Sequence, residues 1–413
     1  MHAKHLIPVI PFEDVVITRG EGSAVFGRDG VRLVDLTSGQ FCTVLGNGNS
    51  EVHDEISRRT ETLVNTSTAI VSDEVLAAAE ALHRISGEMR ASSIILSTGA
   101  EVIEFCLRNA KHIQGKPGII CFDYGYHGLT LGAQSVTMGG SYTVPRVPSI
   151  YPIPVPGADW TDEQLGASLA SLEELMQSAD DVAAMLIEPI VSVGGMIYPP
   201  VRWLAAARAL CDKYGILLIF DECQTGFGRT GDWFAYQTFG VVPDMVAVAK
   251  GAGLGYPVAV AMFRDTLIER AGRLPAHYSS HQNDPFGAAV VNTAIEYIER
   301  HDVLEQVTKM SAYFLDALTA MAATTPYLAN PRGGGLMLGV DLSIPGVTDY
   351  RPIYATIVHS LLERGVILQG TSGGSVLRFL PDYLISENDV DESLRKIAEI
   401  VTETAEKILV HVD

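Results

Sequence analysis

Short apolar runs recur through the middle of the chain, and segments with helical spacing of apolar residues lie between them. Residues 216–220 and 245–249 consist entirely of apolar side chains, which is typical of β-strands buried on both faces of a sheet. The further expected strands are residues 93–96, 118–122 and 183–187, and the expected helices between the strands are residues 102–112 and 201–214. This alternation predicts an α/β fold with a mostly parallel sheet sandwiched by helices.

The two ends of the chain have a different pattern. Two short apolar runs around Gly30, within residues 25–36, predict a β-hairpin. The remaining expected elements are helices at residues 51–64, 73–89, 285–323 (with a break at 300–302), 354–363 and 386–410, strands at residues 336–342, 366–368 and 376–380, and a proline-rich loop at residues 141–161. We therefore predict an N-terminal arm with part of a small domain (1–70), a large domain (71–325) and the C-terminal part of the small domain (326–413).

The composition is that of a globular protein with an acidic surface. Of the 413 residues, 47% are hydrophobic and 19% are charged, and the formal net charge is −20. This charge argues against nucleic acid and against an anionic membrane surface as partners. We expect neither a secretory leader nor a membrane span, because no apolar segment has the required length and flanks. The five scattered cysteines, mostly inside apolar runs, indicate buried thiols in a reducing compartment. We therefore expect a cytoplasmic protein.

Two of the expected strands end in ionisable residues. Asp221 follows residues 216–220, and Lys250 follows residues 245–249. Ligands of open α/β sheets bind at the carboxyl ends of the strands. A carboxylate at the end of such an apolar run stays ionised only if a cation or hydrogen-bond donors meet it, and a protonated ring nitrogen would serve. A desolvated lysine amine is a nucleophile that traps carbonyl groups, although a lysine pointing to water fits the position of Lys250 equally well.

Other strand ends carry further candidate groups. Thr98, Gly99 and Ala100 form a glycine turn before a helix, which suits a phosphate group, although many α/β turns look alike. Tyr126 follows the next strand and either stacks on a planar ligand or caps the core. Glu188 ends a third strand and is either a site carboxylate or a helix-capping, solvated one.

An arginine inside an apolar strand completes the set. Arg378 lies within residues 376–380 and needs a carboxylate, which is either internal or part of a substrate. A phosphate seat, an aromatic stack, a buried aspartate, a lysine amine and a carboxylate-binding arginine are together the groups that pyridoxal phosphate and an amino acid require.

These motifs resemble the class III pyridoxal-phosphate-dependent aminotransferases, which have fold type I. The similarity covers nearly the whole chain, and its most specific part is the segment 220–231, FDECQTGFGRTG, with Lys250 downstream. The resemblance implies that Lys250 forms the Schiff base and moves the proton, that Asp221 holds the pyridinium, and that Gln224 reaches the phenolic oxygen. The cofactor-binding residues that it implies are Thr98, Gly99, Ala100, Tyr126, His127, Glu188, Asp221, Gln224, Lys250 and Ser280, the last from the neighbouring subunit of a homodimer or a dimer of dimers.

Within this family the chain is most similar to the 2,2-dialkylglycine decarboxylase subgroup. The subgroup has the sequence Thr-Ser-Gly-Gln, found here at residues 37–40, and an Asp-Pro pair after the phosphate-binding hydroxyl, found here at residues 284–285. The similarity implies that Gln40, Tyr126 and Arg378 bind the substrate. It also implies a site for an alkali ion, K⁺ or Na⁺, whose hard oxygen ligands are Thr66 and Gln282, both through the backbone, together with Thr68, Ser280 and Asp284. The chain departs from the subgroup in having Tyr126 instead of Trp and Val193 instead of Ser.

The sequence thus predicts an enzyme that moves an amino group from an amino acid or amine to a keto acid such as pyruvate. If Gln40 holds a carboxylate perpendicular to the cofactor ring, the first bond broken is to CO2, and the reaction is decarboxylation-dependent transamination of a 2,2-dialkylglycine. An amino-acid epimerase or racemase, or a plain ω-aminotransferase, is the alternative on the same scaffold. A phosphate-binding α/β protein without chemistry is the non-enzyme alternative, although the three-glycine dinucleotide fingerprint is missing.

Overall fold

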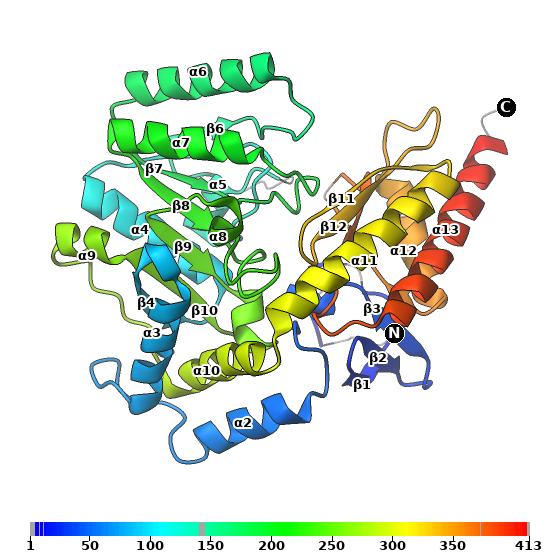
Figure 1. Ribbon diagram of the computed structural model, residues 1–413, viewed down its shortest axis with the longest axis horizontal. Coiled ribbons are helices and arrows are strands. Elements are labelled where there is room, and N and C mark those ends of the chain that lie inside the picture. Colours follow the sequence, from blue (N-terminus) through cyan, green and yellow to red (C-terminus); the bar gives the residue numbers. More distant parts are fainter. Residues whose placement is uncertain (1–4, 8, 11, 140–144, 372, 411–413) are drawn as a thin grey trace.

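A seven-stranded sheet forms the centre of the molecule. The computed structural model describes residues 5–7, 9–10, 12–139, 145–371 and 373–410. In the order of the sheet, the strands are β4 (Ala91–Leu96), β10 (Ala259–Arg264), β9 (Met245–Val248), β8 (Leu217–Asp221), β7 (Val182–Ile187), β5 (Gly118–Phe122) and β6 (Ile150–Ile153). Only β10 runs antiparallel to its neighbours β4 and β9. The predicted α/β fold with a mostly parallel sheet is confirmed (Figure 1).

Helices cover both faces of this sheet. The alternation of side chains along β8 determines which of its residues face the helix on one side and which face the helix on the other. Leu217 and Ile219 belong to the apolar layer against α4 (Gly99–Gln114). Leu218 and Phe220 belong to the opposite layer, against α7 (Val201–Tyr214). Because successive side chains of a strand alternate between faces, Asp221 continues the row that faces α4, whose first turn lies at the same edge of the sheet.

The predicted loop at residues 141–161 is wrong in part. Residues 141–144 lie outside the described residues, but Ile150–Ile153 forms strand β6, which pairs in parallel with β5. This strand contains Pro152, which has no N–H to donate, and such residues are tolerated at the edge of a sheet. β6 is an edge strand, so the proline content is compatible with pairing on one side only.

Two four-stranded sheets lie beside the central sheet (Figure 1). The first contains β1 (Ile17–Glu21), β2 (Ala24–Gly27), β3 (Arg32–Asp35) and β13 (Val366–Ile367), and the second contains β11 (Leu328–Gly333), β12 (Leu338–Leu342), β15 (Val376–Phe379) and β14 (Gln369–Gly370). The predicted hairpin is confirmed as β2 and β3, which pair antiparallel. β13 pairs in parallel with β3, so that segments from both ends of the chain share one sheet. The predicted domain boundaries at residues 70 and 325 stay a prediction.

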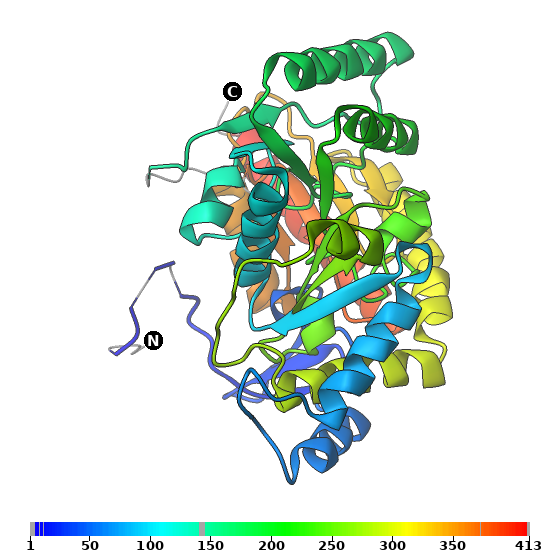
Figure 2. The same ribbon diagram turned by 90° about the vertical axis from the view of Figure 1, so that its left-hand side faces the viewer.

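The other helices complete the layers. They are α1 (Ser38–Phe41), α2 (Ser50–Thr60), α3 (Asp73–Ile85), α5 (Leu131–Val136), α6 (Asp162–Ser178), α8 (Ala235–Phe239), α9 (Asp265–Ala271), α10 (Pro285–Arg300), α11 (Val303–Thr324), α12 (Arg351–Glu363) and α13 (Glu387–Val410), with 3₁₀ turns η1 (Gly87–Met89) and η2 (Lys250–Gly253). The predicted break near residue 301 is confirmed, because Asp302 has φ +49° between α10 and α11. The side view shows α6 and α7, in green, stacked at one end of the molecule (Figure 2). None of the described helices is long and apolar enough to cross a membrane.

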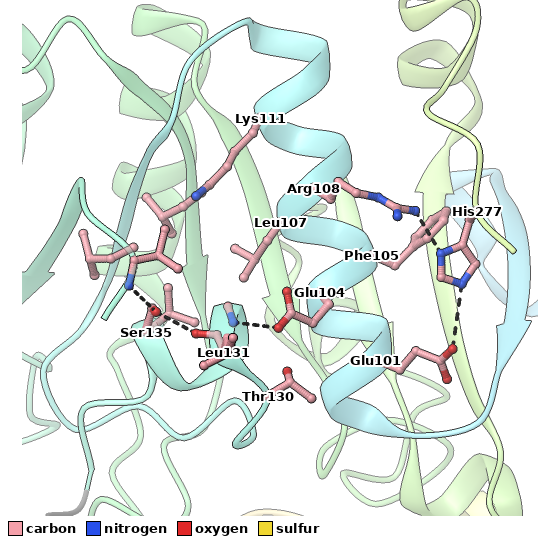
Figure 3. Close-up of a pocket in the computed structure, with 15 residues that line it drawn as sticks. Glu101, Glu104, Phe105, Leu107, Arg108, Lys111, Thr130, Leu131, Ser135 and His277 are labelled. Carbon is pink, nitrogen blue, oxygen red and sulfur yellow. Dashed lines mark hydrogen bonds and ion pairs between the residues drawn. The ribbon is translucent and has the colours of Figure 1, made fainter. Parts of the chain in front are cut away.

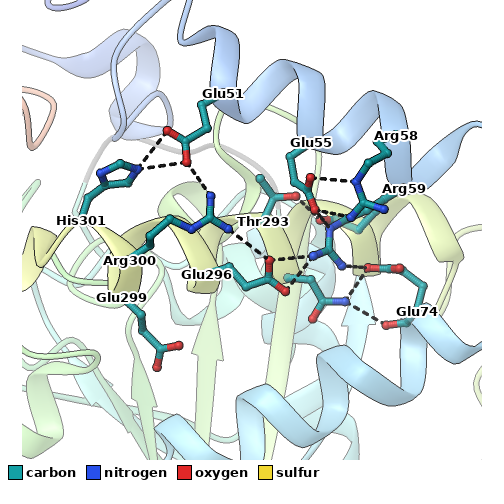
Figure 4. Close-up of polar contacts among 12 residues, drawn as sticks. Glu51, Glu55, Arg58, Arg59, Glu74, Thr293, Glu296, Glu299, Arg300 and His301 are labelled. Carbon is teal, nitrogen blue, oxygen red and sulfur yellow. Dashed lines mark hydrogen bonds and ion pairs between the residues drawn. The ribbon is translucent and has the colours of Figure 1, made fainter.

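An ion-pair network joins three helices around α10. Arg59 of α2 is bonded to Glu55 of the same helix, to Glu74 of α3 and to Glu296 of α10, at 2.6–2.7 Å (Figure 4). The Arg59 side chain is only 11% exposed, and a network of this kind contributes more than isolated surface pairs do. It fixes α10, whose first residue, Pro285, directly follows a segment that the sequence assigns to the site.

Candidate active site

Asp221 is a buried carboxylate at the carboxyl end of β8. Its Oδ2 lies 2.8 Å from Nδ1 of His127, and its Oδ1 accepts a hydrogen bond from the backbone N–H of Cys223 at 3.0 Å. Burial alone raises the pKa of Asp221, but the His127 contact and the Cys223 N–H outweigh it and leave the pKa below its usual value. The prediction that this carboxylate is desolvated and met by donors agrees with the geometry.

His127 has a contact that the sequence does not indicate. The resemblance places it with Tyr126 among the cofactor-binding residues, and the structure puts its ring against Asp221. The His127 side chain is fully buried, and its Nε2 has no hydrogen-bond partner among the described residues. The one signal in the sequence is its position after β5, at the same sheet edge as Asp221, which does not by itself reveal the contact.

Glu188 lies directly beyond β7 and is buried. It is therefore not the helix-capping, solvated glutamate that was one of its two expected roles. Its Oε1 accepts the N–H of Tyr126 at 2.8 Å, and its Oε2 accepts the N–H of Ser192 at 3.3 Å. Burial raises the pKa of Glu188 to about 7, the charge of Asp221 adds to the rise, and His127 opposes it. Glu188 therefore holds the backbone that carries Tyr126, and it does so as a carboxyl group that titrates near neutral pH.

The first turn of α4 lies against the ends of β8 and β9. Thr98 is the N-cap, and its hydroxyl accepts the N–H of Glu101 at 3.3 Å. A Cβ added to Gly99 would lie 3.2 Å from Sγ of Cys223 and 3.4 Å from Cβ of Ala249, so the glycine permits this close approach. The first N–H groups of a helix have no acceptor within the helix, so the N–H groups of Gly99 and Ala100 suit an anion such as a phosphate group.

Lys250 begins the 3₁₀ turn η2 directly after β9, the parallel neighbour of β8. Its φ is +47°, a backbone conformation that non-glycine residues adopt rarely and that clusters at functional sites. The side chain is half-buried, and within the described parts of the chain its amine forms no hydrogen bond or ion pair. Gln224, three residues after Asp221, has a buried Oε1 that also lacks a partner among the described residues.

Arg378 is buried in β15 and faces the central part of the molecule. Its Nη1 donates to Oγ of Ser192 at 3.0 Å, and its guanidinium carbon lies 5.2 Å from the centre of the Phe41 ring. Burial lowers the pKa of Arg378 to about 10, so the group is charged at neutral pH. No described carboxylate forms an ion pair with Arg378, and its Nε has no hydrogen-bond partner among the described residues. A carboxylate of the protein itself, one of the two partners expected for Arg378, is therefore not found among the described residues.

The segment around Gln40 connects Arg378 with the lysine turn. Phe41 lies under Arg378, and α1 packs beside η2. The positive charge of Lys250 acts on the thiol of the half-buried Cys42, although burial is the larger effect and raises its pKa. The other four cysteines are buried, as predicted, and all five are free thiols. The short segment that contains Gln40 thus contacts both Arg378, through Phe41, and the lysine turn.

The two segments assigned to an alkali ion are in contact. The side-chain N–H of Asn65 donates to the backbone oxygen of Ser280 at 3.0 Å, and the N–H of Phe286 donates to the oxygen of Val64 at 3.2 Å. The carboxylate of Asp284 is buried and accepts hydrogen bonds from the Gly287 N–H and the His281 ring.

The individual ion-site residues have different surroundings. Thr66 is half-buried, whereas Thr68 and Ser280 are exposed. Gln282 has a buried Oε1 without a partner among the described residues. The residues predicted to bind the ion thus lie on the two segments in contact, 64–68 and 280–286, but they differ in their exposure to solvent.

A separate cavity of about 500 Å³ lies on the flank of α4 (Figure 3). Several of its polar groups have partners within its walls: Glu104 accepts the N–H of Gly132 at 2.7 Å, and Nη2 of Arg108 lies 2.9 Å from Nδ1 of His277. None of the predicted cofactor-binding residues lines it. The cavity is therefore not part of the candidate active site.

Comparison with known proteins identifies the family. The model of the class III aminotransferase family matches residues 9–401. The acetylornithine aminotransferase of Archaeoglobus fulgidus is 31% identical to this chain over 95% of the chain and 96% of the relative. The 4-aminobutyrate aminotransferase of Mycobacterium leprae is 32% identical over 94% and 91%. The [LysW]-aminoadipate semialdehyde/glutamate semialdehyde transaminase of Sulfolobus acidocaldarius is 30% identical over 95% and 96%. The chain belongs to the class III aminotransferases.

Solved structures support the same fold. A PMP-bound aminotransferase from Vibrio fluvialis superimposes with a TM-score of 0.89 at 23% identity over 98% of this chain and 97% of its own. An S-selective transaminase from Bacillus megaterium gives a TM-score of 0.90 at 22% identity over 98% and 97%. The predicted fold type I of pyridoxal-phosphate enzymes is confirmed. The relatives named here are transaminases, so the finer similarity to a decarboxylase is not reflected in them.

The residues present fit pyridoxal phosphate, the cofactor of this family. Asp221 accepts hydrogen bonds from the His127 ring and from the Cys223 N–H, and because a carboxylate has about four acceptor positions, it can also accept one from a protonated ring nitrogen. The buried, unpartnered Oε1 of Gln224, the first turn of α4 and the amine of Lys250 supply the remaining polar contacts. The ring, phosphate and aldehyde of the cofactor thus each have a matching group at one sheet edge.

The raised pKa of Glu188 predicts a pH-dependent stability. The folded state keeps the proton of this carboxyl up to about pH 7, whereas the ordinary value is 4.5. The stabilisation is therefore complete below pH 4.5 and is lost as the pH rises through 7, by up to about 3 kcal/mol. Urea unfolding of the wild type and of Glu188→Gln should give free energies whose difference changes over this window. Parallel curves between pH 4.5 and pH 7 would contradict the assignment.

Proposed function

We propose that this class III aminotransferase moves an amino group from an amino acid, whose carboxylate Arg378 binds, to a keto acid such as pyruvate. The observation that carries the proposal is the buried guanidinium of Arg378, which has a serine hydroxyl but no described carboxylate as partner. A desolvated charge of this kind needs an anion, and a substrate carboxylate supplies one with the bidentate geometry that arginine prefers.

The residues divide the chemical work among them. Bound pyridoxal phosphate supplies a carbonyl for the amino group and an electron sink for the bond that breaks at Cα. The amine of Lys250 would accept the proton that leaves Cα of the amino acid and would donate it again in the later proton transfer. Asp221, kept ionised by His127, stabilises positive charge on the ring nitrogen. The first turn of α4 holds the phosphate, and Tyr126 covers the ring.

Replacement of Arg378 tests the substrate-binding role. For donors with a carboxylate, Arg378→Met should lower kcat/KM by an amount corresponding to about 2–5 kcal/mol, because a buried charge pair loses one partner. Arg378→Lys keeps the charge but not the planar fork, so it should give a smaller loss. An amine donor without a carboxylate serves as the internal control and should be affected little. Equal losses for both kinds of donor would exclude carboxylate binding by Arg378.

The decarboxylating form of the reaction is a second candidate, favoured by the position of Gln40 on α1, which packs beside the lysine turn. A carboxylate held at Gln40, rather than at Arg378, would stand perpendicular to the ring, and the bond to CO2 would then break first. The alternatives to decarboxylation are a plain ω-aminotransferase and an epimerase or racemase. The similar proteins are aminotransferases, which agrees with the ω-aminotransferase.

Incubation with 2-aminoisobutyrate and pyruvate distinguishes these possibilities. Because this donor has no hydrogen on Cα, only decarboxylation can transfer its amino group, and acetone, CO2 and alanine should form in equal amounts. In Gln40→Leu the CO2 release should fall by about 10-fold or more, since a polar contact made in the transition state is lost. If the enzyme transaminates ordinary donors but releases no CO2 from 2-aminoisobutyrate, the decarboxylating reaction is excluded and the protein is a plain aminotransferase.

We also infer that the site is completed by a second subunit and by an alkali ion, K⁺ or Na⁺. An interface is supported by exposed apolar side chains, 42–62% accessible, beside the contacting segments 64–68 and 280–286. These side chains are Leu63, Val64, Ile70 and Val71. Ser280 from the neighbouring subunit then reaches the phosphate of the cofactor. Thr66, Thr68, Ser280, Gln282 and Asp284 are the proposed ion ligands.

Cation exchange tests the ion site. Thermal unfolding of the purified protein in K⁺ or Na⁺ should occur at a higher temperature than in the bulky tetramethylammonium ion, because a ligand that binds only the folded state stabilises it. Thr68→Val removes one oxygen ligand and should reduce this difference, whereas Thr308→Val, on α11, should not. The same unfolding temperature in all three cations would rule the site out.

A further inference from the structure

The backbone at Gln40 is held in place by a buried carboxylate. Asp35 ends β3, and its Oδ1 accepts the N–H and the hydroxyl of Thr37 at 2.8 and 2.6 Å. Its Oδ2 accepts the N–H of Gly39 at 2.6 Å. Gly39 has φ +68°, a conformation that favours glycine, and the chain turns sharply there. Gln40 follows this turn, so its main chain is fixed although its side chain is exposed.

Large, buried groups fix the same turn from the other side. The hydroxyl of Ser38 donates to the backbone oxygen of Leu380 at 2.9 Å and accepts a hydrogen bond from Arg229 at 3.3 Å. Arg229 is 1% exposed. The turn at residues 37–40 is therefore anchored to segments 191 and 342 residues away in sequence, and the main chain that leads into Gln40 is fixed by the core.

The side chain of Gln40 has one polar partner among the described residues, Gln369 of β14. Nε2 of Gln369 donates to Oε1 of Gln40 at 3.1 Å. An amide has one acceptor oxygen and one NH2 group with two donors. With its oxygen engaged, Gln40 has its NH2 group left for another molecule, because no described residue accepts from it. A donor of this kind suits a carboxylate and does not suit an ammonium group.

Gln369 and Arg378 are direct partners across the antiparallel strands β14 and β15. Directly opposed residues in such a pair project to the same face of the sheet, about 4.5–5.5 Å apart at Cβ. One strand pair therefore carries both the arginine and the residue that orients Gln40. The two donors, the Arg378 guanidinium and the Gln40 NH2, are fixed relative to each other by the register of this sheet.

We propose that Gln369 is a positioning residue for substrate specificity. It holds the amide of Gln40 so that its NH2 group faces the substrate, and the site then accepts a second carboxylate or other acceptor oxygen beside the one bound by Arg378. This inference rests on the proposed function, in which Arg378 binds the first carboxylate. The substrate class that it selects is an amino acid whose Cα carries, besides the carboxylate bound by Arg378, a second substituent with a carboxylate or another acceptor oxygen.

A pair of unreactive ligands measures this selection without turnover. The holoenzyme is first reduced with borohydride, so that no chemistry with the amine follows. Calorimetry then gives the dissociation constants of isobutyrate, which has one carboxylate, and of 2-methylmalonate, which has two on one carbon. The ratio of the two constants reports the second carboxylate, and the isobutyrate constant alone reports the first.

Gln369→Leu should reduce the preference for 2-methylmalonate by about 2- to 10-fold, the range that a neutral hydrogen bond of ordinary strength allows, and should leave isobutyrate binding unchanged. Gln369→Glu accepts from the amide instead of donating to it, so it turns the Gln40 oxygen toward the ligand and should reduce the preference further. Both effects should vanish in a Gln40→Leu background, because the double-mutant cycle isolates the path through Gln40.

Two results would overturn the proposal, and they are distinguishable from failure of the proposed function. If the Gln369 variants change the preference equally in the wild-type background and in the Gln40→Leu background, Gln369 acts through Arg378 or through the fold. If the preference is unchanged while isobutyrate still binds to the wild type, Gln369 has no positioning role. Absence of isobutyrate binding to the wild type, by contrast, contradicts carboxylate binding by Arg378 and removes the basis of both.

Discussion

The hydrogen bond between His127 and Asp221 is the interaction on which the candidate site depends. A carboxylate at the end of a fully buried strand would take up a proton if nothing opposed the loss of water. The His127 ring at 2.8 Å and the Cys223 N–H at 3.0 Å keep it ionised. In the proposed function, an ionised Asp221 would stabilise positive charge on the ring nitrogen of bound pyridoxal phosphate, which supplies the electron sink. Glu188, beside the same pair, holds the backbone next to His127.

The geometry of the sheet brings the remaining groups to this carboxylate. Alternation along β8 turns Asp221 toward α4, the parallel pairing with β9 places the lysine turn next to it, and Gly99 lets the first turn of α4 approach. The groups proposed to recognise the substrate come from elsewhere in the chain. Arg378 lies in β15, and the turn at residues 37–40 is anchored to the core by Asp35 and Arg229. The groups proposed for the chemistry thus lie at the edge of the central sheet, and the groups proposed for specificity lie in or beside the two smaller sheets.

The sequence was sufficient for the groups that end apolar runs and insufficient for those that act through tertiary contacts. Asp221 and Lys250 follow strands whose apolar character predicts their burial, so their proximity followed from parallel pairing alone. The contact of His127 with Asp221 joins residues 94 positions apart, and the contact of Gln369 with Gln40 joins residues 329 positions apart, so neither follows from the local sequence. β6 was missed because Pro152 argues against a strand unless the strand is known to lie at an edge.

The most direct test of the account is the identity of the residue that binds the cofactor. The purified protein, saturated with pyridoxal phosphate, is reduced with borohydride and digested, and the modified peptide is identified by mass spectrometry. We expect the label on Lys250 alone, and we expect Asp221→Ala to retain less cofactor after dialysis. A label on Lys111 or distributed over surface lysines, with Lys250 unmodified, would contradict the central claim that β8 and β9 deliver the two cofactor-binding groups to one sheet edge.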